Sequence, residues 1–366
     1  MCRQGLMEEN YLDFSKIKKV LIAKLRHHGD VLLTSPIFSL LHSRFPYLKI
    51  DAYIYQETLP MLEGHPAISN FLLYDKEWKK LPFFKRYLKE IGLLKKIRER
   101  NYDLVINLTE GDRGAIAAKI SKCQYSVGFD PEGKGMMKKK ECYTHIVKHT
   151  PQPRHTVEKQ LDALRCLGLF PSVDERELFF HIPLGAKENV NNLLAAFGIE
   201  AGQFIQIHPV SRWMFKALPI DHIVELITLL HQKGEKIVLT ASSDPSEMKM
   251  NQEICNRLSH IPICDLSGKI TLKELGAVIE MSRLLISIDS LPVHISSALQ
   301  TPAVAIFGPT SEINWGPWRN PNSRIVTNSF SCRPCYQPGC GGSRKSDCLE
   351  TLSPQKIYEA AVDFLH

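Results

Sequence analysis

Short apolar runs alternate along the chain with longer segments in which apolar residues recur every three or four positions. The first run, Lys18 to Leu25, predicts a buried strand, and the apolar pattern after Asp30 predicts a helix. The first half continues with predicted strands at 50–55, 70–74, 103–107 and 125–128, and helices at 84–100 and 113–120. Strands that alternate with helices indicate an α/β fold with parallel sheets.

The pattern restarts in the second half of the chain. A helix predicted at 155–168 is followed by a loop and extended segment at 171–183, which places a domain boundary near residue 180. The second half then predicts strands at 204–208, 236–240, 284–288 and 303–307, and helices at 220–233, 246–258, 272–281 and 292–299. We therefore expect two α/β domains in tandem, with ligands bound in loops beyond the carboxyl ends of the strands.

Composition narrows the class of protein. The 366 residues suffice for two hydrophobic cores, and the net charge of +7, from 46 basic and 39 acidic residues spread along the chain, argues against a nucleic-acid binder. No apolar run approaches the roughly 20 residues that span a bilayer, and the polar N-terminus resembles no signal peptide. We expect a cytoplasmic protein whose ten cysteines are reduced thiols or metal ligands.

The loop after the first predicted strand carries Asp30 at the expected start of a helix. The positive end of the helix dipole stabilises the ionised carboxylate, so Asp30 could accept a proton from an attacking hydroxyl. The same position is also typical of a residue that only caps the helix. The Gly-x-Gly-x-x-Gly pattern of dinucleotide-binding loops is absent here.

The loops of the second half gather groups that suit a diphosphate. Ser211, Arg212 and Lys216 lie between a strand and a helix, although a solvated basic loop would have the same composition. Further candidates follow the other strands of this half, and they are Asp244, Asp289, Ser290, His294, Gly308 and Thr310. Ser290 is predicted to cap a helix, His294 is equally consistent with a structural histidine, and Gly308-Pro309 with a plain turn.

Two further segments have a distinctive composition. Between Lys76 and Arg100, ten basic residues and three glutamates are interleaved with aromatic side chains, a pattern that favours an anionic lipid surface or only a solvated helix face. Near the C-terminus, four thiols could bind a structural zinc ion or remain free or paired, and they belong to Cys332, Cys335, Cys340 and Cys348.

Together these stretches resemble the ADP-heptose:lipopolysaccharide heptosyltransferases, glycosyltransferase family nine, over nearly the whole chain. The motifs that carry the resemblance, in the family's order and spacing, are Gly29-Asp30, the His208-Pro209 loop ending in Lys216, Ser267-Gly268-Lys269, Asp289-Ser290 with His294, and Phe307-Gly308-Pro309-Thr310. The tail ending Asp347-Cys348-Leu349 most resembles the branch called lipopolysaccharide core heptosyltransferase III. The chain departs from many members at Leu291, where they carry Gly, and within 211–215.

The resemblance implies a GT-B architecture, in which two Rossmann-like domains face a central cleft. It implies an acceptor-binding domain at 1–180, a nucleotide-sugar-binding domain at 181–350, and a C-terminal helix at 351–366 that packs back on the N-terminal domain. Asp30 matches the general base, Lys216 the phosphate-binding lysine, and Asp244 an acidic nucleoside contact. Asp289 and His294 match the donor-site pair, and catalysis needs no metal or other cofactor.

The implied reaction is an inverting transfer of heptose from ADP-heptose to a heptose of the lipopolysaccharide inner core, at the cytoplasmic face of the inner membrane. Candidate acceptor-binding residues are Arg26, Arg113, Lys134 and Arg154. Two other hypotheses remain open at this point. One is another GT-B nucleotide-sugar enzyme such as an epimerase, and the other is a non-catalytic adaptor at the membrane surface that uses only the basic segment and the cysteines.

Overall fold

The computed structural model describes residues 11–365, and its internal contacts divide them into two compact units. The first unit contains residues 11–59, 65–152 and 157–176. The second contains 60–64, 153–156 and 177–365.

The first unit is built on a six-stranded parallel sheet in the order β3-β2-β1-β4-β5-β6. Its strands are β1 (Lys19–Lys24), β2 (Lys49–Tyr55), β3 (Ile68–Tyr74), β4 (Leu104–Asn107), β5 (Tyr125–Phe129) and β6 (His145–Val147). Its helices are α1 (His28–Leu32), α2 (Ser35–Arg44), α3 (Phe83–Glu99), α4 (Asp112–Ser121) and α5 (Thr156–Arg165).

The second unit repeats this plan with a six-stranded parallel sheet in the order β12-β11-β10-β7-β8-β9. Its strands are β7 (Phe204–His208), β8 (Lys236–Leu239), β9 (Ile263–Asp265), β10 (Leu284–Ile288), β11 (Ala303–Phe307) and β12 (Ser323–Thr327). Its helices are α6 (Leu184–Ala195), α7 (Ile220–Gln232), α8 (Pro245–Arg257), α9 (Leu272–Met281), α10 (Leu291–Leu299), α11 (Glu312–Trp315), α12 (Asp347–Glu350) and α13 (Pro354–Val362).

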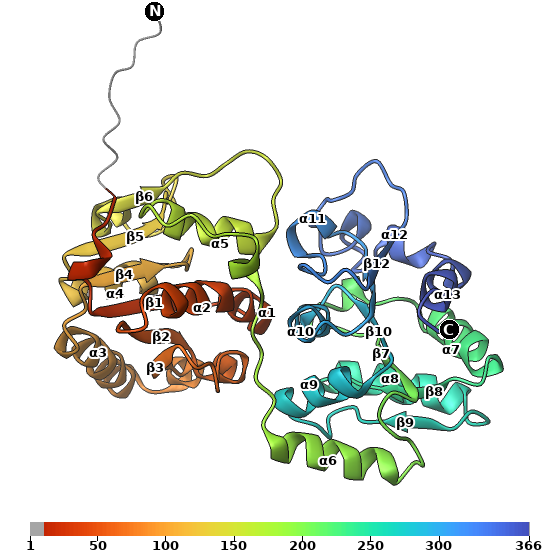
Figure 1. Cartoon of the computed structure of the whole chain (residues 1–366). Coiled ribbons are helices and arrows are strands. Elements are labelled where there is room, and N and C mark those ends of the chain that lie inside the picture. Colours follow the sequence, from red (N-terminus) through yellow and green to blue (C-terminus); the bar gives the residue numbers. More distant parts are fainter. Residues whose placement is uncertain (1–10, 366) are drawn as a thin grey trace, which may run out of the picture. The chain divides into compact units, whose positions relative to one another are not determined.

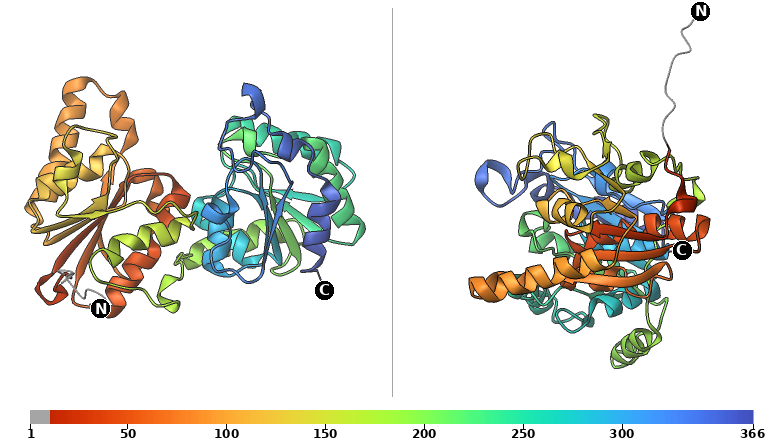
Figure 2. Two further views of the ribbon diagram at one scale, coloured as in Figure 1. Left: turned by 90° about the horizontal axis from the view of Figure 1, so that it is seen from above. Right: turned by 90° about the vertical axis from the view of Figure 1, so that its left-hand side faces the viewer.

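Helices cover both faces of each sheet (Figures 1 and 2). In β7, Ile205 and Ile207 point to a core shared with α7, α8 and α13, while Phe204 points to the core beneath α6 and α9. All five residues of β7 are therefore buried, which is why the sequence shows a continuous apolar run rather than an alternating one. In β1 all residues except Lys19 are buried, and Leu21 and Ala23 pack on the side of α3 and α4.

The last helix, α13, packs within the second unit. It contacts α7, β11 and β12, and Ile357 and Ala361 are buried in the same core as Ile306 and Val326. This helix lies directly after α12 in the chain, and its apolar side is buried within its own unit. Packing of the C-terminal helix on the N-terminal domain stays a prediction.

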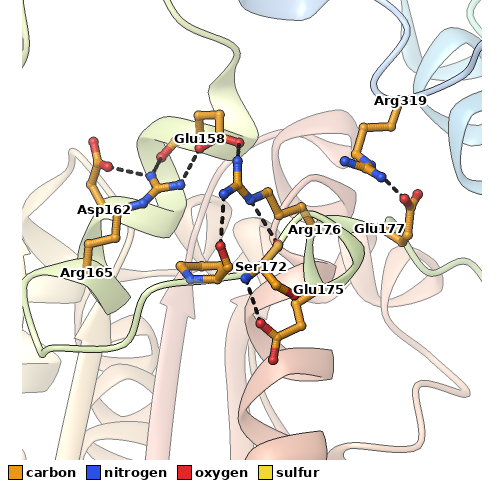
Figure 3. A network of polar contacts seen from close by, with 9 residues as sticks. Glu158, Asp162, Arg165, Ser172, Glu175, Arg176, Glu177 and Arg319 are labelled. Carbon is orange, nitrogen blue, oxygen red and sulfur yellow. Dashed lines mark hydrogen bonds and ion pairs between the residues drawn. The ribbon is translucent and has the colours of Figure 1, made fainter.

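An ion-pair network fixes the chain where it leaves α5 (Figure 3). Arg165 and Arg176 both bind the carboxylate of Glu158, Arg176 at 2.8 Å, and Arg165 also binds Asp162 at 2.7 Å. Within the second unit, Glu177 pairs with Arg319 at 2.6 Å. These contacts hold the segment that the sequence marks as a connection between the two halves.

The α/β class and the two Rossmann-like sheets predicted from the sequence are confirmed. The prediction missed β6, β9, β12, α6 and the four-residue helices α11 and α12. The three strands lie at the edges of the sheets and have only three to five residues, so each gives a weak pattern. Among the described helices, none combines the length and apolar character needed to cross a bilayer.

Candidate active site

The strand order reverses at one place in each sheet, between β1 and β4 in the first unit and between β7 and β10 in the second. In open α/β sheets, ligands bind outside the carboxyl ends of the strands at this switch point. Asp30 follows β1, while Lys216 and Asp289 follow β7 and β10. The topology thus places three of the predicted site residues where the fold itself creates a binding position.

Asp30 is the third residue of α1 and is half-buried. The residue at the helix cap is His27, so the alternative in which Asp30 is only a capping residue does not describe this structure. Among residues 11–365, no hydrogen bond or ion pair engages the Asp30 carboxylate, and the Gln160 side chain donates to the Asp30 backbone oxygen at 3.5 Å. The carboxylate is therefore available as a proton acceptor at the positive end of a helix.

Lys24, which the sequence analysis did not single out, is buried at the end of β1. Its ammonium donates to the carbonyl oxygen of Leu108 at 2.9 Å, which joins the ends of β1 and β4. Burial lowers the pKa of Lys24, and the negative charges of Asp30 and Glu110 oppose that shift. A lysine inside an otherwise apolar strand was the sequence signal that could have identified it.

In the second unit, Lys216, Asp289 and Thr310 form one connected cluster. The Lys216 ammonium lies 2.7 Å from Oδ2 of Asp289, and the Thr310 hydroxyl donates to the same oxygen at 2.5 Å. The Lys216 side chain is 17% exposed and that of Asp289 is 6% exposed. The loops after β7, β10 and β11 are thereby tied together at the switch point.

The start of α10 borders this cluster. Ser290 occupies the cap position, as predicted, but its hydroxyl donates to the carbonyl oxygen of Ile288 at 3.1 Å and does not cap the helix. His294 is buried on the first turns of α10, with its ring 6.4 Å from that of Trp315. Both residues thus follow Asp289 in the chain, Ser290 at the cap of α10 and His294 within that helix.

The polar side chains in the loop after β7 differ in exposure to solvent. Ser211 is buried and accepts a hydrogen bond from the Trp213 backbone at 3.0 Å, so it shapes the loop. Arg212 is exposed, with its guanidinium 5.7 Å from the centre of the Trp213 ring. Arg212 also helps to lower the pKa of Asp244, although the larger cause is hydrogen bonding by Ser246.

Two acids follow β8. Asp244 is exposed and caps α8, accepting from the Ser246 backbone at 2.9 Å. Glu247, which the sequence analysis missed, is buried and accepts from the Ser242 backbone at 2.9 Å. An acid at this strand end often binds ribose hydroxyls in Rossmann-like domains, so both side chains are candidates for that contact.

Gly308 has a packing role. A Cβ atom at this position would lie 2.6 Å from the Leu349 side chain, and Arg333 donates to the Gly308 carbonyl oxygen at 2.6 Å. Arg333 also contacts Glu312 at 3.2 Å. The tail reaches the loop after β7 as well, because Ser346 donates to the Phe215 carbonyl oxygen at 2.7 Å. The cysteine-containing segment therefore braces the loops that carry Lys216 and Thr310.

The four tail cysteines are free thiols, and they range from the exposed Cys332 to the buried Cys348. Burial raises the pKa of Cys348 to about 11. Nowhere in residues 11–365 do three or more His, Cys, Asp or Glu side chains gather in a group that could hold a metal ion. The structural zinc site considered at Cys332, Cys335, Cys340 and Cys348 stays a prediction.

The four predicted acceptor-binding residues are dispersed. Arg26 is exposed near Glu110, with a separation of 3.6 Å, and Lys134 is exposed in the loop after β5. Arg113 lies in the first turn of α4 and donates to the Tyr74 hydroxyl at 3.0 Å. Arg154 is half-buried in the segment 153–156, which groups with the second unit, whereas the sequence placed it in the first domain.

Comparison with known proteins places this geometry in a family. The model of glycosyltransferase family 9 (heptosyltransferase) matches residues 91–343. The chain is 32% identical to lipopolysaccharide heptosyltransferase 3 of Escherichia coli over 297 residues, which cover 81% of this chain and 85% of that protein.

Solved structures with a similar fold include the glycosyl transferase family 9 protein of Veillonella parvula and the E. coli heptosyltransferase WaaC with ADP. The first has a TM-score of 0.80 at 21% identity and covers 97% of this chain and 99% of that one. The second has a TM-score of 0.73 at 19% identity and covers 94% and 99%.

Proposed function

Because the chain belongs to glycosyltransferase family 9, the heptosyltransferases, and is thus a glycosyltransferase, we propose that it transfers heptose from ADP-heptose to a heptose of the lipopolysaccharide inner core, as a heptosyltransferase III. The observation that carries this proposal is the cluster of Lys216, Asp289 and Thr310 at the switch point of the second sheet. We propose this donor because its diphosphate can bind the ammonium of Lys216, and its sugar hydroxyls can bind the carboxylate of Asp289 and the hydroxyl of Thr310. The 32% identity to the E. coli heptosyltransferase 3 supports this acceptor class.

In the proposed reaction, Asp30 removes the proton from an acceptor hydroxyl as its oxygen attacks the anomeric carbon of the donor heptose. The new bond joins the acceptor oxygen to that carbon, and the bond from the carbon to the ADP phosphate oxygen breaks. ADP leaves with the electron pair, and the configuration of the anomeric carbon is inverted. An aspartate is a weak base, so departure of the leaving group runs ahead of proton transfer.

Stabilisation of the leaving group falls to the second unit in this proposal. Lys216 supplies a cation, and Arg212 is exposed on the same loop. A well-placed donor to a developing negative charge is worth about 3 to 4 kcal/mol of the barrier. Asp289 is already hydrogen-bonded to Thr310 and paired with Lys216, so its free oxygen is left to orient the donor sugar hydroxyls.

The proposal includes a location at the anionic, cytoplasmic face of the inner membrane. The start of α3 exposes Phe83, Phe84 and Tyr87, and Lys79, Lys80 and Lys85 are exposed next to them. Aromatic rings anchor at the lipid headgroup level, and each nearby basic residue adds about 1 kcal/mol of attraction to an anionic leaflet. This surface, defined by these six residues, is called the α3 patch below.

The test is a transfer assay with purified protein, ADP-heptose and core lipids truncated at defined sugars. We expect ADP release in a 1:1 ratio to heptose incorporated, with product on one truncation series only. An epimerase would convert the donor without acceptor, and an adaptor would bind vesicles without releasing ADP. Either result would overturn the proposal.

A further inference from the structure

A cavity of about 360 Å³ opens in the first unit between α3, α4 and the strands β2 and β3. Its polar lining comes from Tyr53, Tyr74, Arg86, Glu90, Asp112 and Arg113, and its apolar lining from α3 and α4. The size is within the range of small-ligand sites, about 300 to 1,000 Å³. None of the interactions proposed for the reaction uses this cavity.

The two acids in its wall are already compensated. Glu90 accepts from the Tyr74 hydroxyl at 2.6 Å and from Arg86 at 3.2 Å. Burial opposes ionisation of Glu90, but these hydrogen bonds outweigh it and lower its pKa. Asp112 accepts from the Met136 backbone at 3.0 Å and pairs with Lys139 at 3.3 Å. The positive charge of Arg113 also helps to lower the pKa of both carboxyl groups, although neither of them forms an ion pair with it.

Arg113, unlike Arg86, makes no direct ion pair with the acids of this wall. Its guanidinium lies 4.4 Å from the centre of the Tyr74 ring and donates one hydrogen bond, to the Tyr74 hydroxyl. In the described part of the chain, no carboxylate lies within ion-pair distance of Arg113. A guanidinium has five N–H donors, so most of those of Arg113 remain available, and stacking on Tyr74 fixes their plane.

Tyr53 adds a second unused donor. The side chain is only 2% exposed, yet its hydroxyl makes no hydrogen bond to any of residues 11–365. Burial raises the pKa of this hydroxyl, so it stays protonated and can donate. Tyr53 lines the cavity, so its hydroxyl is available to a molecule bound there.

The geometry points to a subsite in this cavity, formed by Arg113 and Tyr53, for an oxyanion of the glycolipid acceptor, a phosphate or a sugar carboxylate. Arginine binds both groups bidentately, and a neutral hydroxyl beside it completes the coordination. The inference rests on the proposed function, because it takes the acceptor to be an anionic core lipid. Arg86 and Glu90 of the cavity wall lie on α3, and the α3 patch lies at and just before the start of the same helix. A lipid acceptor held at the patch would therefore be near the cavity.

The experiment compares the single variants Tyr53→Phe, Arg113→Met and Arg113→Lys with wild type in the transfer assay. We expect Tyr53→Phe and Arg113→Met to raise the KM for acceptor about tenfold or more, with kcat and the KM for ADP-heptose within twofold of wild type. Arg113→Lys keeps the charge and should recover part of the loss. Tyr53→Phe removes an oxygen without a protein partner, so its folding should be unchanged.

Matched controls are Tyr125→Phe and Arg98→Met, which lose the same groups elsewhere in the unit. Two acceptors distinguish the source of the oxyanion, one with its phosphates and one enzymatically dephosphorylated with its sugar carboxylates intact. A defect that disappears with the dephosphorylated acceptor identifies phosphate, and one that persists identifies carboxylate. Wild-type KM values for acceptor in Tyr53→Phe and Arg113→Met would overturn the subsite while transfer itself still stands, whereas absence of transfer by wild type would overturn the proposed function.

Discussion

The ammonium of Lys216 and the carboxylate of Asp289 lie 2.7 Å apart, although 73 positions separate them in the chain. Thr310 donates to the same carboxylate oxygen. The pair is mostly buried, so each charge depends on the other for compensation. This pairing predicts that substitution of one partner will destabilise the fold more than substitution of both.

We expect Lys216→Ala to weaken ADP binding about tenfold or more, because a cation at the diphosphate is lost. It should also lower the free energy of unfolding by about 3 kcal/mol, since it leaves a buried carboxylate unpaired. Adding Asp289→Asn should restore stability but not ADP affinity. Calorimetry with ADP and denaturant unfolding measure both quantities, and unchanged ADP affinity of the folded Lys216→Ala variant would place the donor elsewhere.

We expect Asp30→Asn to lower turnover by about 10² or more, because it removes the proposed general base. The fold and ADP affinity should be unchanged, since the described residues make no hydrogen bond to this carboxylate. Glu110→Gln is the matched control, because Glu110 is a nearby exposed acid. Near-normal turnover of Asp30→Asn would remove the residue from the mechanism.

Arg333 should act on the donor site through the loop after β11. It holds the Gly308 carbonyl oxygen two residues before Thr310. We expect Arg333→Met to raise the KM for ADP-heptose several-fold and to leave the acceptor KM unchanged. Cys332→Ser, at an exposed thiol of the same segment, is the control and should behave as wild type. If Arg333→Met lowers stability without changing the KM for ADP-heptose, the contact between Arg333 and Gly308 has only a structural role.

The α3 patch is tested by replacing Lys79, Lys80 and Lys85 with Gln. Arg86 is left intact because it binds Glu90 in the cavity wall. Binding to vesicles with anionic lipid should weaken, most strongly at low salt, while ADP affinity stays constant. The control replaces three exposed lysines of the second unit, Lys233, Lys249 and Lys356. Equal vesicle binding by both triple variants and wild type would make the patch a solvated surface.

Buried His208 should make stability depend on pH. Desolvation lowers its pKa to about 4, from an ordinary value of about 6.5. A depressed pKa in the folded state means that the unfolded state binds the proton first as pH falls. The stabilisation is thus complete above about pH 6.5 and is lost progressively down to about pH 4, by at most about 3 kcal/mol. Thermal unfolding between these pH values should show a steeper fall in Tm for wild type than for His208→Asn.

The sequence by itself determined the α/β class, most strands and helices, and the strand ends at which the reactive side chains would stand. Continuous apolar runs such as 204–208 and 303–307 predicted their strands at the observed bounds, because both faces of these strands are buried and the pattern is strong. It could also place Lys216 and Asp289 at one edge of the second sheet, since the carboxyl ends of parallel strands share an edge, and Asp30 at the corresponding edge of the first sheet.

Only the tertiary structure decided which of these side chains contact one another and which already have a hydrogen-bond or ion-pair partner. It joined Lys216 to Asp289, revealed the buried Lys24 and Glu247, and showed that Gly308 is required by packing against Leu349. It placed α13 on the second unit and brought Tyr53 beside Arg113 in one cavity. The physical reason is that such contacts depend on side-chain packing between elements far apart in the chain, for which local periodicity carries no signal.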